Sequence, residues 1–324
     1  MNIKVGTFNL FQYAKPPYSW YVKKDRFEIK QWEEKNSFIK KQLKQMNCDI
    51  VAFQEVFSYE ALEELTKQLG FKYFKVVDTA KTDKKNDKVF ISTTVALASK
   101  YEINKLSTIE VKEEVLEKLN IKQPFYFSRL PIKANICINN TDVLIYVFHL
   151  KSNRLNEYEY KFNEDDTINL KVKKSIYAMN NLNATSLKQR LAEAYHLALD
   201  ISNSLKHQKK VVALGDLNDR QNSLVIDILT NKALLDIDLF SKGYDIKNKK
   251  EYFLYDSYEK ALKKTKIKEA TSYYKAVGNI LDYIFVSKDI DVLEYILFNN
   301  HLLKNKDGSL LQSDHAQVVA TLKL

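Results

Sequence analysis

Residues 211–219 carry an acid and an amide at a spacing that suits chemistry (VVALGDLND). The apolar, β-branched first half predicts a buried strand that ends at Gly215. Alternate side chains of an extended chain point the same way, so Asp216 and Asn218 can face one point beyond the strand. A carboxylate there can act as a general base, and an amide can donate a hydrogen bond. Taken alone, however, the segment is more typical of a strand that runs into an Asx turn.

Several other predicted strands begin or end on polar residues in the same way. The carboxyl-terminal ends carry Asn9, Glu55 and His149, and the amino-terminal ends carry Asp282, Asp314 and His315. In a mixed sheet, an antiparallel strand begins at the edge where its parallel neighbours finish. All these groups can therefore converge on one rim of one or two sheets.

The residue types at these strand ends suit different tasks. Glu55 and Asp314 offer hard, negatively charged oxygen ligands, which favour Mg²⁺ over zinc. Asp216 can deprotonate water, while His149 and His315 can place protons or hydrogen bonds on an anion. The set thus combines cation ligands, a base and donors to an anion.

Amphipathic helices are predicted between the strands. Apolar spacing indicates helices over residues 32–46 and 59–69, the second capped by Ser58 and closed by Gly70. A third helix starts at Ser186, with apolar residues at 4-3-4-3-4 spacing up to residue 205.

Charged and histidine residues away from the strand ends are interpreted as solvated. Arg190 and Glu193 are expected to be surface charges on the third helix, and His196 lies off its apolar stripe. His207 and His301 fall in polar loops and are also expected to be exposed.

The composition is that of a soluble globular protein with a basic balance. Of 324 residues, 51 are Lys or Arg and 41 are Asp or Glu, giving a formal net charge of +10. Such an excess favours phosphate-bearing partners, although a Lys-rich solvated surface explains it equally well.

Neither membrane association nor a disulfide is expected. The first residues enter a predicted strand directly, and no apolar run reaches the roughly 18 residues that span a bilayer. The two cysteines, Cys48 and Cys137, are interpreted as free thiols in a reducing compartment. These features predict a cytoplasmic protein without stable membrane association.

Six short motifs resemble those of the endonuclease/exonuclease/phosphatase superfamily, which includes the deoxyribonuclease I-like enzymes. They occur in the family's order and span nearly the whole chain. The motifs are Thr7-Phe8-Asn9, Phe53-Gln54-Glu55, His149-Leu150-Lys151-Ser152, Gly215-Asp216-Leu217-Asn218, Leu281-Asp282-Tyr283-Ile284 and Ser313-Asp314-His315.

The resemblance implies an α/β fold, a four-layer α-β-β-α sandwich with two facing mixed sheets. It implies one domain over residues 1–324, with polar insertions near 155–185 and 240–265 that match no particular subfamily. No match is found for the acidic residue that some relatives set against the first histidine, His149.

The resemblance also implies roles for the individual side chains. Asp216 would activate the attacking water, and Asp282 would support His315 against the phosphate. The residues implied as Mg²⁺ or Mn²⁺ ligands are Asn9, Glu55 and Asp314, and those implied to hold phosphate oxygens are Asn218 and His149.

The expected activity is metal-dependent phosphodiester hydrolysis of nucleic acid, with DNA favoured over RNA. Two alternatives stay open: a phosphomonoesterase or lipid phosphodiesterase on the same fold, and a non-catalytic nucleic-acid-binding protein. Arg129 either touches substrate phosphate or makes a structural hydrogen bond. Lys151, Asn153 and Arg154 either line the mouth of the site or belong to a solvated loop.

Overall fold

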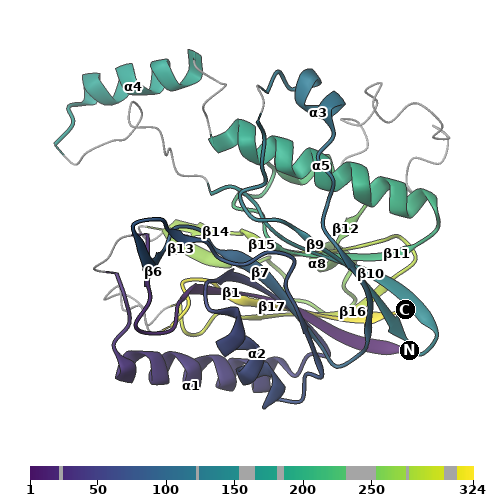
Figure 1. Ribbon diagram of the computed structural model, residues 1–324. Coiled ribbons are helices and arrows are strands. Elements are labelled where there is room, and N and C mark those ends of the chain that lie inside the picture. Colours follow the sequence, from purple (N-terminus) through teal and green to yellow (C-terminus); the bar gives the residue numbers. More distant parts are fainter. Residues whose placement is uncertain are drawn as a thin grey trace.

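Two six-stranded mixed sheets lie face to face in the computed structural model (Figure 1). The first sheet has the order β16 (Asp291–Phe298), β17 (Gln317–Lys323), β1 (Asn2–Tyr13), β3 (Ile50–Val56), β7 (Thr94–Ser99) and β4 (Tyr73–Lys75). The second has the order β12 (Tyr255–Asp256), β15 (Asp282–Val286), β11 (Lys210–Asp216), β10 (Thr141–His149), β9 (Ile132–Ile138) and β8 (Ile103–Ser107).

The structure describes residues 1–21, 25–121, 124–152, 165–180, 186–230, 253–274, 277–302 and 312–324. Asn153 and Arg154 lie outside these ranges, as do parts of both predicted insertions, 155–164 with 181–185 and 240–252. Within residues 155–185, the structure has one helix, α4 (Ile168–Asn180), among the described positions.

Helices cover the outer face of each sheet. Below the first sheet in Figure 1 lie α1 (Ile29–Met46) and α2 (Tyr59–Lys67), and above the second lie α3 (Glu113–Lys118) and α5 (Ser186–Lys206). The shorter elements are α6 (Leu224–Thr230), α8 (Ser257–Lys260), the pair β13 (Ser272–Tyr274) and β14 (Val277–Asn279), and the small sheet β2 (Ser19–Trp20), β6 (Asn86–Phe90) and β5 (Thr82–Asp83).

Three apolar layers separate the four structural layers. The central layer joins both sheets, with Val5 and Ile50 from the first packed with Ile145 and Val212 from the second. The outer layers join α1 and α2 to the first sheet and α3 and α5 to the second. Burial of apolar area on both faces of both sheets is the main force that holds this arrangement. The predicted four-layer α-β-β-α sandwich is therefore confirmed.

The predicted helix starts agree with the structure to within one turn. Ser58 precedes α2 as predicted, but its hydroxyl accepts a hydrogen bond from the Lys15 backbone N–H at 2.9 Å instead of capping the helix. Cys48 and Cys137 are both free. Among the described residues, none of the helices is long and apolar enough to span a membrane.

Candidate active site

Strand register in the second sheet brings three of the predicted residues into one row. The parallel pairing of β10 with β11 sets His149 opposite Asp216. The antiparallel pairing of β11 with β15 sets Asp216 opposite Asp282. The side chains come from positions up to 133 residues apart, yet hydrogen bonding between backbones fixes them at the same edge of the sheet.

The first sheet closes over this row from the other side. Asn9 of β1 donates from Nδ2 to Oδ2 of Asp216 at 3.0 Å. The hydroxyl of Ser313 donates to the backbone oxygen of Asn9 at 2.6 Å and accepts from the backbone N–H of His315 at 3.0 Å. These bonds hold the segment before β17 against the end of β1, so both sheets contribute to a single site.

The carboxylate of Asp216 lies at the centre, and its residue is 1% exposed. Its Oδ2 is 3.5 Å from Nε2 of His149 and 4.0 Å from Nε2 of His315. Burial raises the pKa of Asp216 to about 7, although the charge of His315 opposes the rise. A carboxylate with such a pKa is a stronger base than an exposed one, which suits proton abstraction from water near neutral pH.

Gly215 is required immediately before this carboxylate. Its φ is +150°, and a Cβ atom there would lie 2.0 Å from the backbone oxygen of Phe148. Only glycine fits where β10 and β11 approach so closely. The glycine that ends the apolar run in the sequence therefore sets the position of Asp216.

The predicted Asx turn is present at Asn218, which also lies in the site. Its backbone N–H donates to Oδ1 of Asp216 at 2.7 Å, which closes the turn, and its φ is +51°. Its side-chain Nδ2 donates to the backbone oxygen of Leu150 at 2.9 Å. The turn and the active-site interpretation of this segment are thus compatible.

Asp282 and His315 form the predicted pair. Nδ1 of His315 lies 2.8 Å from Oδ2 of Asp282, which is fully buried. Burial alone would lower the pKa of His315, but the carboxylates of Asp282 and Asp314 raise it well above its usual value. His315 is therefore a cation near neutral pH, and its Nε2–H is suited to an anionic ligand.

His149 has the opposite electrostatic character. Burial lowers its pKa well below the usual value, and the positive charges of Arg129 and His315 lower it further. Its Nδ1 is buried and has no hydrogen-bond partner among the described residues. The sequence offers no match for the acidic residue that some relatives set against this histidine, and none of the described carboxylates hydrogen-bonds to Nδ1.

The predicted metal ligands lie on the first-sheet side of the site. Glu55, at the end of β3 with a φ of +56°, accepts a hydrogen bond at Oε2 from the Gln12 backbone N–H at 2.9 Å. Oδ1 of Asp314 is buried without a hydrogen-bond partner in the described part of the chain. Burial raises the pKa of Asp314, and the nearby charge of Glu55 adds to the rise. Asn9 accepts from the Phe11 backbone N–H at Oδ1 at 3.0 Å.

These oxygens fit a hard divalent cation. The carboxylates of Glu55 and Asp314 and the amide oxygen of Asn9 are the hard oxygen donors that Mg²⁺ prefers, and Oδ1 of Asp314 forms no hydrogen bond within the described residues. A second grouping also exists, because Asp216, Asp282 and His315 place ligand atoms within 4.8 Å of one another. In that grouping Nδ1 of His315 is already bonded to Asp282, so the oxygen-only set suits Mg²⁺ better.

Lys35 of α1 is a site neighbour that sequence reasoning missed. It is 1% exposed, with Nζ over the rings of Phe11 and Phe27 at 5.9 and 5.2 Å. Burial lowers its pKa to about 7, while the charges of Asp314 and Glu55 act in the opposite direction. The sequence did carry a signal, since Lys35 lies four residues before Ile39 on the apolar face of the helix.

Four residues predicted to be solvated are buried, so those predictions are wrong. Arg190, Glu193 and His196 are each 1% exposed and His301 is 6% exposed, whereas His207 is exposed as predicted. Each buried group has partners that make burial tolerable. Nε of Arg190, for example, bonds Asp219 at 3.0 Å, and Nδ1 of His196 lies 2.8 Å from the backbone oxygen of Ala192.

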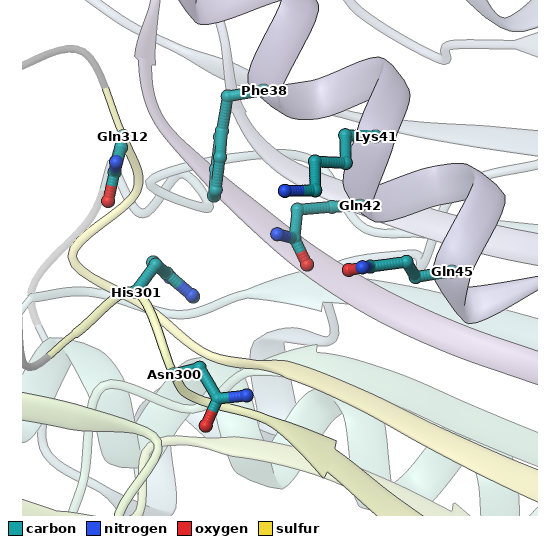
Figure 2. Close-up of a pocket in the computed structure, with 7 residues that line it drawn as sticks. All are labelled: Phe38, Lys41, Gln42, Gln45, Asn300, His301 and Gln312. Atoms are coloured by element: carbon teal, nitrogen blue, oxygen red, sulfur yellow. The ribbon is translucent and has the colours of Figure 1, made fainter.

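His301 borders a cavity of about 270 Å³ beside the site (Figure 2). Figure 2 shows Phe38, Lys41 and Gln42 of α1 directed toward this cavity, with His301 across from them. Nε2 of His301 lies 2.9 Å from the backbone oxygen of His315. The cavity therefore backs onto the main chain of His315, but none of the predicted catalytic side chains lines it.

The sequence profile of the Endonuclease/Exonuclease/phosphatase family matches residues 6–315. The chain belongs to this family. Its members are phosphoesterases, generally dependent on divalent metals. No curated protein matches the sequence.

Several solved structures share the fold of this phosphoesterase. The human Nocturnin catalytic domain with bound sulfate anion has a TM-score of 0.60 at 16% identity, over 99% of this chain and 94% of that one. An endonuclease/exonuclease/phosphatase from Bacteroides vulgatus has a TM-score of 0.58 at 14% identity, over 100% and 99%. A Bacteroides thetaiotaomicron mannosyl-6-phosphatase has a TM-score of 0.52 at 15% identity, over 99% and 100%. At these identities the likeness concerns the fold alone.

Proposed function

We propose that this phosphoesterase hydrolyses phosphodiester bonds of nucleic acid, with DNA favoured, by in-line attack of a water molecule activated by Asp216. One observation carries the proposal: a buried carboxylate with a raised pKa lies between two histidines and receives hydrogen bonds from Asn9 and Asn218. That arrangement provides a base and donors to an anion within one site.

Each side chain around Asp216 has a distinct role in the proposal. Asp216 orients the water and takes its proton. His149 and Asn218 bind phosphate oxygens, and cationic His315, held by Asp282, contacts the phosphate. Negative charge on the phosphoryl group under attack is stabilised mainly by such fixed donors.

Asn9, Glu55 and Asp314 would hold the divalent ion, Mg²⁺ or Mn²⁺. When bound, the ion would neutralise negative charge on the reacting phosphate. Burial raises the pKa of Asp314, and the nearby charge of Glu55 adds to the rise. A bound cation would offset the repulsion between these two carboxylates.

The choice of nucleic acid as substrate and partner rests on charge. The formal net charge of +10 favours a polyanion, because binding releases counterions. The proposal includes a cytoplasmic location.

A phosphomonoester is the second candidate substrate, supported by the similarity in fold to a mannosyl-6-phosphatase.

A substrate panel tests the proposal. The purified chain is incubated with supercoiled plasmid, single-stranded DNA, RNA, a hexose phosphate and sphingomyelin vesicles, each with Mg²⁺ and with chelator. We expect metal-dependent cleavage of nucleic acid, and we expect D216N, purified in parallel, to show none. Release of phosphate or phosphocholine alone would move the substrate to the second class, and salt-sensitive DNA binding without cleavage would indicate a non-catalytic binding protein.

A further inference from the structure

In the loop that follows His149, one backbone oxygen accepts hydrogen bonds from two side chains. The backbone oxygen of Leu150 accepts from Nδ2 of Asn218 at 2.9 Å and from Nη1 of Arg129 at 3.1 Å. The guanidinium of Arg129 therefore lies beside an amide that we assign to phosphate binding. Its charge is also close enough to lower the pKa of His149.

The positive charge of Arg129 is not neutralised by the protein within the described ranges. Arginine has five N–H donors, and the hydrogen bond to Leu150 uses one nitrogen. No described carboxylate forms an ion pair with this guanidinium, and the residue is partly exposed. An anion from solution is the partner that such a cation lacks.

The position of Arg129 is set by Glu193 of α5. The two carboxylate oxygens of Glu193 accept separate backbone N–H groups, from Ser128 and from Lys151, each at 2.6 Å. One buried carboxylate thereby ties the residue before Arg129 to the residue after Leu150. Charge-assisted hydrogen bonds in such a dry environment are strong and directional.

Arg190, one helical turn away, extends the same support. Its Nε bonds Oδ2 of Asp219 at 3.0 Å, and its Nη1 donates to the backbone oxygen of Lys151 at 3.2 Å. Asp219 directly follows Asn218. Helix α5 therefore fixes the three loops that carry Arg129, Leu150 and Asn218.

The metal ligands and Arg129 come from opposite halves of the fold. Asn9, Glu55 and Asp314 belong to β1, β3 and the segment before β17, all in the first sheet. Arg129 precedes β9 and bonds the loop after β10, both in the second sheet. A phosphate above Asp216 would thus have cationic charge on both sides.

We propose that Arg129 is a further substrate contact, which binds phosphate oxygens on the side opposite the metal ligands, and that Glu193 is the positioning residue that holds it there. This inference rests on the proposed function, because it specifies how the same site binds its phosphate.

The test compares R129Q, R129K and E193Q with the wild-type chain and with K209Q. Lys209 is exposed and precedes β11, so K209Q removes the same charge away from the site. Calorimetry with inorganic phosphate in the presence of Mg²⁺ measures anion affinity without turnover. Hydrolysis of an oligonucleotide measures kcat and KM separately, over a series of salt concentrations, and circular dichroism with thermal melting confirms that each variant is folded.

We expect R129Q to weaken phosphate binding roughly 10- to 100-fold, the loss typical of a charge-assisted contact. KM for the oligonucleotide should rise in the same range, while kcat changes less. The slope of log KM against log salt should fall by about 1, the value for one lost phosphate contact. R129K should recover part of the affinity, since it restores charge without the planar fork. E193Q should shift KM in the same direction as R129Q, because Gln can accept only one of the two N–H groups.

The outcomes separate this inference from the proposed function. If R129Q and K209Q bind phosphate equally and share one KM, Arg129 is not a substrate contact. If E193Q melts at a lower temperature but keeps wild-type phosphate affinity and KM, Glu193 has only a structural role. If the wild-type chain hydrolyses nothing yet binds phosphate through Arg129, the anion contact stands and the proposed function fails.

Discussion

The buried carboxylate of Asp216 should make the metal-free protein less stable as pH rises, and D216N should remove this dependence. Burial raises the pKa of Asp216 from 3.8 to about 7 in the folded chain. Between these values the folded state keeps a proton that the unfolded state has lost. Stability from this group is therefore fully present below about pH 4 and is lost as pH rises toward 7.

The expected size follows from the same two values. A pKa rise from 3.8 to about 7 corresponds to at most about 4 kcal/mol of unfolding free energy. The attraction between Asp216 and cationic His315, 4.0 Å away, is already contained in this pKa and adds no separate contribution. We therefore expect the stability of the wild-type chain relative to D216N to fall by about 2–4 kcal/mol between pH 4 and pH 8.

Urea unfolding of both proteins in chelator, at half-unit steps of pH, measures this difference. Only the change with pH is informative, because in D216N the amide Nδ2 can face Nδ2 of Asn9, a fixed cost at every pH. Parallel curves for the two proteins would show that Asp216 keeps an ordinary pKa in the folded state. A wild-type chain that gains stability relative to D216N as pH rises would reverse the sign and refute the reasoning.

Three further outcomes are expected. D282N should lower the pKa of His315 toward 6.5, so the alkaline limb of the pH–rate profile should move to lower pH; an unmoved limb would mean that another group sets it. G215A should destabilise the chain by about 2–4 kcal/mol in urea unfolding, because its Cβ would meet the Phe148 backbone oxygen; a shift under 1 kcal/mol would contradict the close approach. Mg²⁺ at a hundredfold excess over its Kd should stabilise the wild-type chain by about 2.7 kcal/mol, and E55Q should require more Mg²⁺ for the same rise in Tm; equal titrations would remove Glu55 from the metal site.

The convergence of the site could be predicted from the sequence because it depends on strand ends. Asp216 ends an apolar run at a glycine, and Asp282 begins another such run. Once β11 and β15 pair antiparallel, register places the two residues opposite each other. Local patterns identify the ends of strands, and the geometry of a mixed sheet then brings them together.

Burial of the charged residues on α5 could not be predicted from the same patterns. The apolar spacing in the sequence marks one face of this helix, with Arg190 at the edge of that face and Glu193 off it. Their partners, Ser128, Lys151 and Asp219, are 29 to 65 residues away in sequence and come from three loops. Only the tertiary fold shows that these loops cover the part of the helix surface that carries Arg190 and Glu193.

Lys35 carries a signal in the sequence for its position near the site. It occupies the same helical face as Ile39 and Leu43, where a lysine is unexpected unless its charge has partners. The charges of Glu55 and Asp314 act on it, but nothing in the helix itself identifies them. A charged residue on a predicted apolar face was therefore a usable signal for proximity to the site.

The most direct test of the active site is kcat/KM for Mg²⁺-dependent hydrolysis of the best substrate by D216N, measured beside D142N. Asp142 is exposed in β10, so D142N makes the same chemical change outside the site. We predict a loss of at least about a thousandfold in D216N, the scale of a missing general base, and wild-type activity in D142N. A D216N chain that stays within tenfold of the wild-type value would show that Asp216 does not activate the attacking water.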